Sequence, residues 1–518
     1  MIDVRKEIPQ SGKMLTAVIV LAVVLGVVWL VSNTITAAGV KGVVLLVAVI
    51  AAAGVAGKTL SDWRSGVYLF LGWLLFEDLV RKYMGNSMYV YFGKDALIAA
   101  TYLGLVLSRL RGDDTERFRA PFKYSLGLFV LLGLAQVFNP SSPSLWYGVL
   151  GLKLYFYYIP LMFVGYALLR SELDLHRLLV VSMGLAGVIA LVGIIQAIAG
   201  LDFLNPHGGA DIDELGHMVR YTPSGVAVPR PPSVFVSDGR FAIYLTVVFI
   251  LGMGTAGYLL LRRTQSGRRI VFPALGLVGV ATTLCGARGA FVWVGASALL
   301  IPVGMLWGAP PRLGEGYRLV KAIRRSFIFV ALAMSLAVVI FPQVVGSRLT
   351  FYRETLALDS PDSEAARRGW SYPLTNLLMA FTDGYWPVGH GIGTASLGVQ
   401  YVSRIMEKPA VSFAVENGYG DLIVEFGILG PLLWLVWASS LVFHAFKTVI
   451  RLKGTWAFPV AFSILWFAFL VLFPFTWATL NTFENFVVNA YFWLLVGVLF
   501  RLPALVDQVS APSNITSD

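Results

Sequence analysis

Apolar stretches recur along almost the whole chain and are separated by mostly short polar connections. A helix needs about 20 apolar residues to cross a bilayer, and most of these stretches approach that length. Backbone polar groups inside lipid have to be satisfied within their own segment, so we expect helices. The pattern predicts an all-α, polytopic helical membrane protein with about 12 to 14 transmembrane helices and one large periplasmic or extracellular loop.

The order of these stretches defines the expected organisation. We place helices near residues 15–33, 37–56, 66–80, 94–108, 122–138, 146–169, 177–199, 240–261, 270–286, 288–307, 326–345, 421–443, 455–475 and 485–500. The regions are N-terminal transmembrane helices (1–200), an outer loop (201–239), transmembrane helices with an arginine motif at their outer face (240–345), a large outer loop expected to be catalytic (346–420), C-terminal transmembrane helices (421–501) and a cytoplasmic tail (502–518).

Composition supports a membrane protein and changes the meaning of the net charge. Of the 518 residues, 57% are hydrophobic and 13% are charged, whereas soluble domains carry about 25% charged residues. The net charge of +11 would suit a nucleic-acid-binding protein, but Lys and Arg fall mostly in connections between the apolar stretches. We therefore expect a lipid bilayer as partner and no nucleic acid. Cys285 is the single cysteine, so no intrachain disulfide is possible.

The positive charges also predict an orientation. Connections such as 109–119, 262–269 and 312–325 are rich in Lys and Arg, whereas 139–145 and 476–484 contain none. Because cytoplasmic connections carry the excess of positive charge, both termini are expected in the cytoplasm. The connection at 81–94 carries Arg81, Lys82 and Lys94 on the outer side and departs from this rule.

Two long segments, 200–239 and 346–420, then lie outside and contain arginines that topology does not require. Arginine suits phosphate because its planar fork donates two parallel hydrogen bonds. Arg288 lies at the outer junction of two apolar stretches, where it either meets an anionic ligand or extends to the membrane interface. The other candidates are Arg230, Arg240, Arg348 and Arg368. The alternatives are an interfacial arginine behind a helix cap for Arg240 and a solvated helix face for Arg368.

The end of the large loop supplies the candidate acid. Glu416 precedes Asn417 and Tyr419 at the outer end of the next span, where a carboxylate serves either as general base or as an acid that complements the helix dipole. His390 lies in a glycine-rich turn, Gly389-His390-Gly391-Ile392-Gly393, that would let backbone approach a ligand. The acidic and histidine residues between 207 and 217 match no metal-ligand spacing, so we expect no metal site.

Four motifs follow one another along residues 220–435. They are Pro231-Pro232-Ser233-Val234-Phe235-Val236-Ser237-Asp238, Ala287-Arg288-Gly289-Ala290, Trp386-Pro387-Val388-Gly389-His390-Gly391-Ile392-Gly393, and Glu416-Asn417-Gly418-Tyr419 followed by Glu425-Phe426-Gly427-Ile428-Leu429-Gly430. Their order resembles that of the O-antigen ligase and polymerase superfamily. Glu416 stands where the ligases of that family have a histidine, and Gly420 stands where they have a leucine.

The resemblance implies glycosyl transfer on the outer face of a bacterial cytoplasmic (inner) membrane, with no cofactor and no metal. The donor would be a glycan on polyprenyl (undecaprenyl) diphosphate, the acceptor a glycan or lipid, and the product an O-antigen or exopolysaccharide. Glu416 as general base and Arg288 at the diphosphate would be catalytic, with inversion at the anomeric carbon. The expected substrate-binding residues are Arg230, Arg240, Arg348, Arg368, His390, Asn417 and Tyr419. A chain-length regulator would be a partner of a polymerase.

Two other classes of function remain open at this point. A small-anion transporter of the bicarbonate type would also gather arginines at its outer face. A non-catalytic envelope assembly protein would need only the shape of the loop. Exchange of Glu416 or Arg288 tests the scaffold, whose product it would leave intact, and anion flux in vesicles with unchanged lipid-linked glycan tests the transporter.

Overall fold

The computed structural model describes residues 51, 53–85, 87–112, 116–206, 218–222, 224–262, 266–308, 321, 324, 335, 338–357, 363–382, 384–396, 399–407, 411–413, 415–479 and 482–510. These residues belong to two compact units. The smaller unit lies within Met1–Phe70 and Asp95–Gly112, and the larger unit lies within Leu71–Lys94 and Asp113–Asp518. The larger unit contains every candidate site residue.

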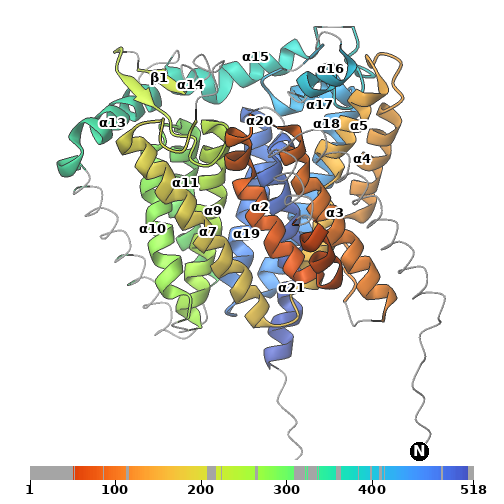
Figure 1. Cartoon of the computed structure of the whole chain (residues 1–518), viewed down its shortest axis with the longest axis horizontal. Helices are drawn as coiled ribbons and strands as arrows, with labels where there is room; N and C mark the ends of the chain where they lie inside the picture. The colour runs from red at the N-terminus through yellow and green to blue at the C-terminus, as the bar shows by residue number, and fades with distance from the viewer. Residues whose placement is uncertain are drawn as a thin grey trace, which may run out of the picture. The chain divides into compact units, whose positions relative to one another are not determined.

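The expected all-α class is confirmed (Figure 1). The α-helices are α2 (Trp63–Tyr83), α3 (Met88–Leu110), α4 (Lys123–Gln136), α5 (Leu145–Phe156), α6 (Leu161–Leu168), α7 (Glu172–Ala199), α9 (Asp238–Leu261), α10 (Arg268–Leu284), α11 (Arg288–Trp307), α13 (Pro342–Leu356), α14 (Glu364–Ala366), α15 (Tyr372–Met379), α16 (Val399–Met406), α17 (Gly418–Phe426), α18 (Leu429–Arg451), α19 (Phe458–Leu470), α20 (Thr476–Ala478) and α21 (Phe486–Ser510). Shorter turns are π-helical η1 (Arg367–Ser371) and η2 (Val471–Phe475) and 3₁₀-helical η3 (Thr482–Glu484). Strands β1 (Val219–Tyr221) and β2 (Ala227–Pro229) pair antiparallel with Arg220 opposite Val228.

Within the described residues, eight helical segments are long and apolar enough to cross a membrane. They are Tyr89–Leu110, Leu145–Leu168, Glu172–Ala199, Asp238–Leu261, Arg288–Trp307, Leu429–Arg451, Phe458–Ala478 and Phe486–Gln508. The expected spans at 15–33 and most of 37–56 and 326–345 lie outside the described residues. The spans expected near 66–80, 122–138 and 270–286 are helices α2, α4 and α10, which are not among the eight.

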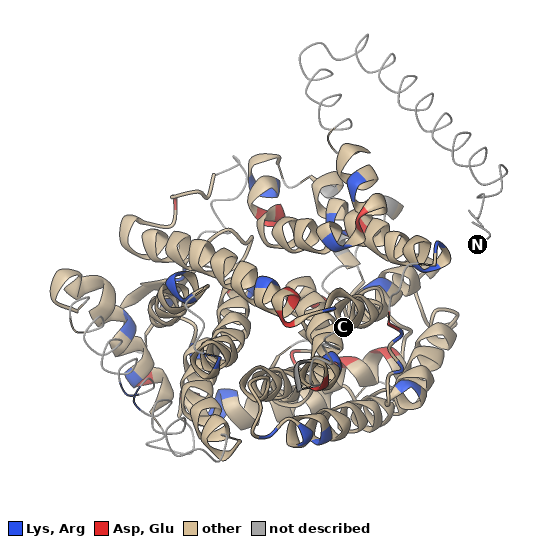
Figure 2. Cartoon of the chain, turned by 90° about the horizontal axis from the view of Figure 1, so that it is seen from below, with Lys and Arg blue, Asp and Glu red and all other residues tan. Residues whose placement is uncertain are grey.

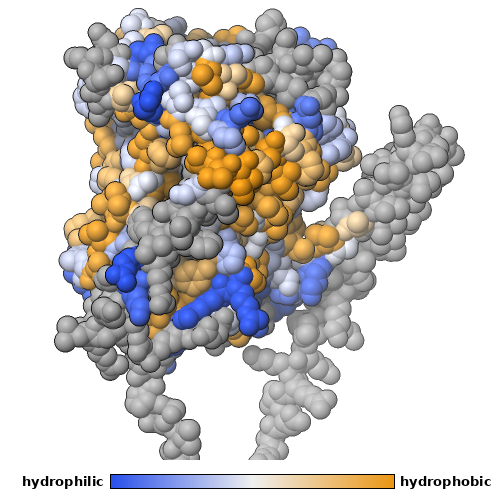
Figure 3. All heavy atoms as spheres, turned by 90° about the vertical axis from the view of Figure 1, so that its left-hand side faces the viewer, coloured by the Kyte–Doolittle hydropathy of each residue, from blue (hydrophilic) through white to orange (hydrophobic). Residues whose placement is uncertain are grey.

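The distribution of polar residues agrees with a membrane environment. Figure 2 shows that Lys, Arg, Asp and Glu are scattered sparsely over helices that are otherwise uncharged. On the face seen in Figure 3, hydrophobic residues gather in the middle and hydrophilic residues lie above and below them. The chain is therefore a multi-pass helical membrane protein.

Helix α21 is the most deeply buried of these spans, with 89% of its apolar window inside the protein. It packs against α6 so closely that a Cβ atom on Gly497 would lie 2.0 Å from the carbonyl oxygen of Met162. Small residues allow such contact between helix backbones, and close packing is what holds transmembrane helices together when lipid surrounds them. A rigid interior therefore supports the loops at the helix ends.

The connections of the larger unit separate into two groups at opposite helix ends. At one end, Gln136 Nε2 donates to the carbonyl of Val388 (2.8 Å), and Asn417 Nδ2 donates to that of Trp477 (2.8 Å). This end also holds β1 and α13–α16, which run across the top of the bundle in Figure 1. At the other end, Arg501 Nε donates to the carbonyl of Leu169 (2.9 Å). The connections that the charge pattern assigned to the outer side thus lie together.

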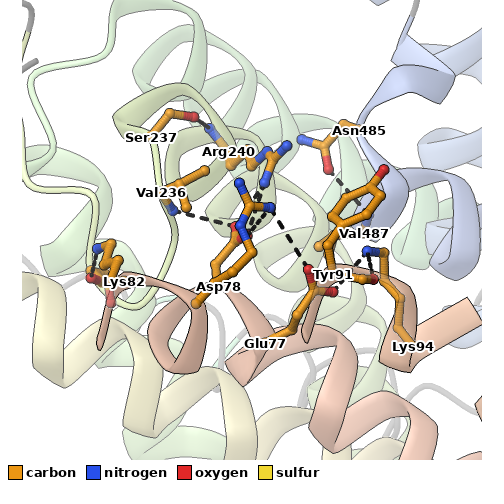
Figure 4. Close-up of polar contacts among 12 residues, drawn as sticks. Glu77, Asp78, Lys82, Tyr91, Lys94, Val236, Ser237, Arg240, Asn485 and Val487 are labelled. Carbon is orange, nitrogen blue, oxygen red and sulfur yellow. Dashed lines mark hydrogen bonds and ion pairs between the residues drawn. The ribbon is translucent and has the colours of Figure 1, made fainter. Parts of the chain in front are cut away.

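The basic connection at 81–94 has a structural explanation. Lys94 Nζ lies 2.8 Å from Glu77 Oε2, and Arg81 Nη1 lies 3.5 Å from Asp78 Oδ1. Lys82 Nζ donates to the carbonyl of Ser233 (3.2 Å). Figure 4 shows Lys94 turned toward Glu77 and Asp78 turned toward Arg240. The three cations are thus committed to partners inside the protein, so they say nothing about orientation.

We predict that Lys94→Ala strongly destabilises the fold. Lys94 and Glu77 both have 0% exposed side chains, and removal of one partner leaves a buried charge that costs about 3–5 kcal/mol. Thermal unfolding in detergent checks this. Arg451→Ala is the control, because Arg451 and Asp507 are each 64% exposed and such a pair contributes about 1 kcal/mol or less. Equal melting temperatures for the two variants would contradict the structural role of the buried pair.

Candidate functional site

Arg288 begins helix α11 and points at the large loop. The preceding residue, Ala287, is extended, so α11 starts sharply after the turn that ends α10. Arg288 Nη1 donates to Glu364 Oε1 (2.8 Å), and its guanidinium carbon lies 5.7 Å from the ring centre of Phe351. The side chain remains 26% exposed, so a ligand can reach it.

Glu364 is shared by three arginines. Arg367 donates to Oε2 through Nε (3.2 Å) and Nη2 (2.8 Å), and Arg368 Nε lies 3.5 Å from Oε1. Partial burial raises the pKa of Glu364, but the hydrogen bonds and positive charges of Arg288 and Arg367 outweigh this effect and lower the pKa. The carboxylate is therefore ionised, and the cluster of three arginines and one glutamate keeps two positive charges in excess.

Glu416 is connected to this cluster through an aromatic side chain. The Tyr372 hydroxyl donates to Glu416 Oε2, and the guanidinium carbon of Arg368 lies 4.5 Å from the Tyr372 ring centre. The bond to Glu416 raises the pKa of Tyr372, which keeps the hydroxyl protonated as a donor. Contacts thus run without a break from Arg288 through Glu364, Arg368 and Tyr372 to Glu416, as the sequence could not show.

Asn417 and Tyr419, which follow Glu416, make hydrogen bonds within the protein. Asn417 is fully buried and caps α17, with Oδ1 accepting from the Gly420 N–H (2.9 Å) and Nδ2 donating to the carbonyl of Pro373 (3.1 Å). The Tyr419 hydroxyl faces the carbonyl of Leu472 (3.4 Å), and burial raises its pKa to about 12. Both residues, expected to bind substrate, are engaged with the protein.

The glycine-rich turn packs against protein backbone. The N–H of His390 donates to the carbonyl of Val424 (2.7 Å), and Asn139 Nδ2 donates to that of Gly389 (2.9 Å). His390 is 5% exposed and stacks on Phe413 with ring centres 4.0 Å apart. A Cβ atom on Gly393 would lie 2.1 Å from the carbonyl oxygen of Tyr147. The glycines are therefore explained by packing of the loop against helix ends.

Arg240 and Arg348 bind partners other than Glu364. Arg240 Nη1 donates to both oxygens of Asp78 (3.1 and 2.8 Å), as Figure 4 shows. Arg348 is 2% exposed and donates to the carbonyls of Leu284 (3.0 Å), Val344 (2.9 Å) and Pro229 (2.9 Å). Arg348 therefore connects α13 to the end of α10 and to β2 through these hydrogen bonds.

Arg230 lies beside the turn that precedes Arg288. Its Cγ is 3.1 Å from the position of a Cβ on Gly286, and its Nη1 lies 2.7 Å from Asp238 Oδ2. Among the described residues, its Nε–H is buried and makes no hydrogen bond. Arg230 is thus paired with Asp238, and its side chain remains 16% exposed.

Three site residues, Glu364, Arg367 and Tyr372, were missing from the expected set. Glu364 lies three and four residues before Arg367 and Arg368, a spacing at which helical side chains pair, so part of the cluster was readable. Tyr372 lies four residues after Arg368 and had no signal of its own. The acidic and histidine residues between 207 and 217 lie outside the described residues.

Glu425 is buried, but its hydrogen-bond partners are uncharged. Oε1 accepts from the N–H of Ala395 (3.1 Å), and the Tyr155 hydroxyl also contributes a hydrogen bond. Burial raises the pKa of Glu425 from an ordinary value of 4.5 to about 7, and the hydrogen bonds only partly oppose this rise. Glu425 joins α17 to the glycine-rich turn and lies apart from the arginine cluster.

Comparison with models of known protein families finds no match, and comparison with curated proteins finds no similar sequence. The fold therefore defines the class of protein: an all-α membrane protein with several spanning helices. The surface formed by Arg288, Glu364, Arg367, Arg368, Tyr372 and Glu416, hereafter the arginine–glutamate surface, is its candidate site.

We predict that Glu425→Gln flattens the pH dependence of stability. Between pH 4.5 and about 7 the folded protein binds more protons at Glu425 than the unfolded chain, so stability falls as pH rises. The loss amounts to at most about 3 kcal/mol, at about 1.4 kcal/mol per pKa unit. Melting temperatures of wild type and variant between pH 5 and 8 test this, and parallel curves would exclude Glu425 as the source.

We predict that Gly393→Ala destabilises the loop, whereas Gly384→Ala is tolerated. Gly393 has a φ of +88°, and its Cβ would meet the Tyr147 carbonyl, while a Cβ on Gly384 meets nothing within 4 Å. Backbone strain alone costs about 1–3 kcal/mol. Limited proteolysis of the large loop measures the effect, and equal cleavage of the two variants would refute this explanation of the turn.

Proposed function

We propose that this protein is a membrane glycosyltransferase that transfers or polymerises glycan from a polyprenyl-diphosphate donor, on the outer face of the bacterial cytoplasmic membrane. The observation that carries the proposal is the unbroken line of contacts from Arg288 to Glu416. It puts an excess of positive charge and an exposed carboxylate on one surface, at the ends of membrane-spanning helices. The proposal includes cytoplasmic termini and an O-antigen or exopolysaccharide as product.

The chemistry follows from these two parts of the surface. As the bond between the anomeric carbon and the diphosphate oxygen breaks, negative charge develops on the leaving diphosphate, and guanidinium groups stabilise it. Glu416 accepts the proton of the acceptor hydroxyl while that oxygen forms the new bond to the anomeric carbon. Attack from the side opposite the diphosphate inverts the configuration. No step in this scheme needs a metal or a nucleotide sugar.

The remaining candidates take supporting roles in this proposal. Arg230, beside the Arg288 turn and 16% exposed, is suited to assist at the diphosphate. Arg240, Arg348 and Asn417 position the elements that carry the site. The ring centre of Trp370, which is 65% exposed, lies 5.4 Å from that of Trp477, and this pair offers an apolar face for a sugar ring.

We expect Glu416→Gln and Arg288→Lys each to reduce transfer about 100-fold, because one loses the proton acceptor and the other the bidentate donor. The measurement is a gel of surface polysaccharide from a deletion strain complemented with each variant. Arg353→Lys is the matched control, since Arg353 is an exposed arginine of the same loop region.

The products that accumulate decide between the candidate activities. Lipid-linked repeat units indicate a polymerase, and long glycan still attached to lipid indicates a ligase. Normal polysaccharide from stably produced Glu416→Gln and Arg288→Lys would refute the assigned site. Anion flux in vesicles with unchanged lipid-linked glycan would instead favour a transporter, and an intact product with both variants would favour a scaffold.

A further inference from the structure

The cluster at Glu364 has an unusual balance of charge for a surface beside a membrane. Three guanidinium groups with exposed fractions of 26%, 58% and 44% converge on one carboxylate. Arginine forks bind any phosphate that presents two oxygens. A bilayer offers singly charged phosphodiesters at very high local concentration, so three free arginines at its surface would hold lipid headgroups.

We propose that Glu364 determines the charge selectivity of the site: it competes for the three arginines, so that a doubly charged diphosphate diester binds and singly charged phosphodiesters are rejected. The inference rests on the proposed function for the identity of the ligand. It adds a role for a residue that touches neither the acceptor nor the reacting carbon.

The charges of the cluster match this ligand. The four residues of the cluster, Arg288, Arg367, Arg368 and Glu364, carry an excess of two positive charges. A diphosphate substituted at both ends, as in a lipid-linked sugar, carries two negative charges. A phosphodiester carries one, and would compete against a carboxylate of equal charge that is already held in place. An external ligand loses translational freedom when it binds, whereas Glu364 is already part of the protein and does not. We therefore expect a singly charged phosphodiester to bind the arginines weakly when Glu364 is present.

Neighbouring residues hold Glu364 and two of its arginine partners in position. Ser363 Oγ accepts from the N–H of Ala366 (3.3 Å), which fixes the turn that carries Glu364. The rings of Phe351 and Tyr372 lie 5.7 Å and 4.5 Å from the guanidinium carbons of Arg288 and Arg368. The guanidinium groups of Arg288 and Arg368 are therefore oriented before a ligand arrives, and the carboxylate is the group that an anion must outcompete.

The test measures binding of two matched probes to the purified full-length protein in detergent, by calorimetry at constant ionic strength. The probes are P1,P2-dimethyl diphosphate, with two charges, and dimethyl phosphate, with one. Wild type is expected to bind the diphosphate and to discriminate strongly against the phosphate. Glu364→Gln is expected to bind dimethyl phosphate at least about 10-fold more tightly than wild type does, a change of about 1.4 kcal/mol. The ratio of the affinities for the diphosphate and the phosphate therefore becomes smaller.

Glu354→Gln is the matched control. It removes the same charge from the same end of the protein, but Glu354 accepts from the N–H (3.1 Å) and hydroxyl (2.8 Å) of Ser224 instead of from arginine. It should leave discrimination unchanged, and Glu364→Asp, which keeps the charge, should preserve most of it. An equal effect of Glu354→Gln would show that overall charge is responsible and would overturn the inference.

The outcomes separate the inference from the proposed function. If wild type binds neither probe, the diphosphate site itself is refuted. If wild type binds the diphosphate and Glu364→Gln leaves the ratio of affinities unchanged, the role of Glu364 is refuted and the proposed function stands. Melting temperatures of the variants establish that each comparison is made on folded protein.

Discussion

A polar group that leaves water in this protein is costly unless it finds a partner inside the chain, and much of the architecture at the helix ends follows from that constraint. An unpaired buried charge or amide costs several kcal/mol in lipid, so partners are close to obligatory. The Glu77–Lys94 pair, the three carbonyls that accept from Arg348 and the backbone bonds of the His390 turn are solutions to the same problem. The bonds of Arg348 and of the His390 turn attach described parts of the large loop to the helix ends.

Contacts of the same kind give the candidate site its geometry. Glu416 is exposed, yet its backbone N–H donates to Asn376 Oδ1 (3.0 Å), and its neighbour Asn417 joins α17 to α15 and α20. The cationic half of the site depends on a different set of bonds, through Arg348 and the α10–α11 turn. Tyr372 connects the two halves. A site assembled in this way from residues up to 128 positions apart needs both halves of its support.

The sequence revealed those features that hydropathy and charge encode locally. Apolar length predicted the spanning helices, and the absence of Lys and Arg in 139–145 and 476–484 predicted which connections lie together. Arg288 and Glu416 were identified because a charge between apolar spans stands out. The pairing of Arg288 with Glu364 joins positions 76 residues apart, and no periodicity encodes such a contact. For the same reason the sequence could not show that Arg240 binds Asp78 or that Arg348 binds backbone carbonyls.

The π-helical turn η1 has a consequence for how this site can change. A π turn holds one residue more than an α turn and arises when a single residue is inserted into a helix. Arg367–Ser371 is such a turn, and it lies between Glu364 and Tyr372. Deletion of one residue there would close the wider turn and leave the residues before it nearly in phase with α15, whereas deletion of one residue within α15 would rotate the helix by about 100°. The π turn therefore absorbs a change in length that a regular α-helix would convert into a rotation, so Glu364 and Tyr372 can keep their relative orientation when this segment gains or loses one residue.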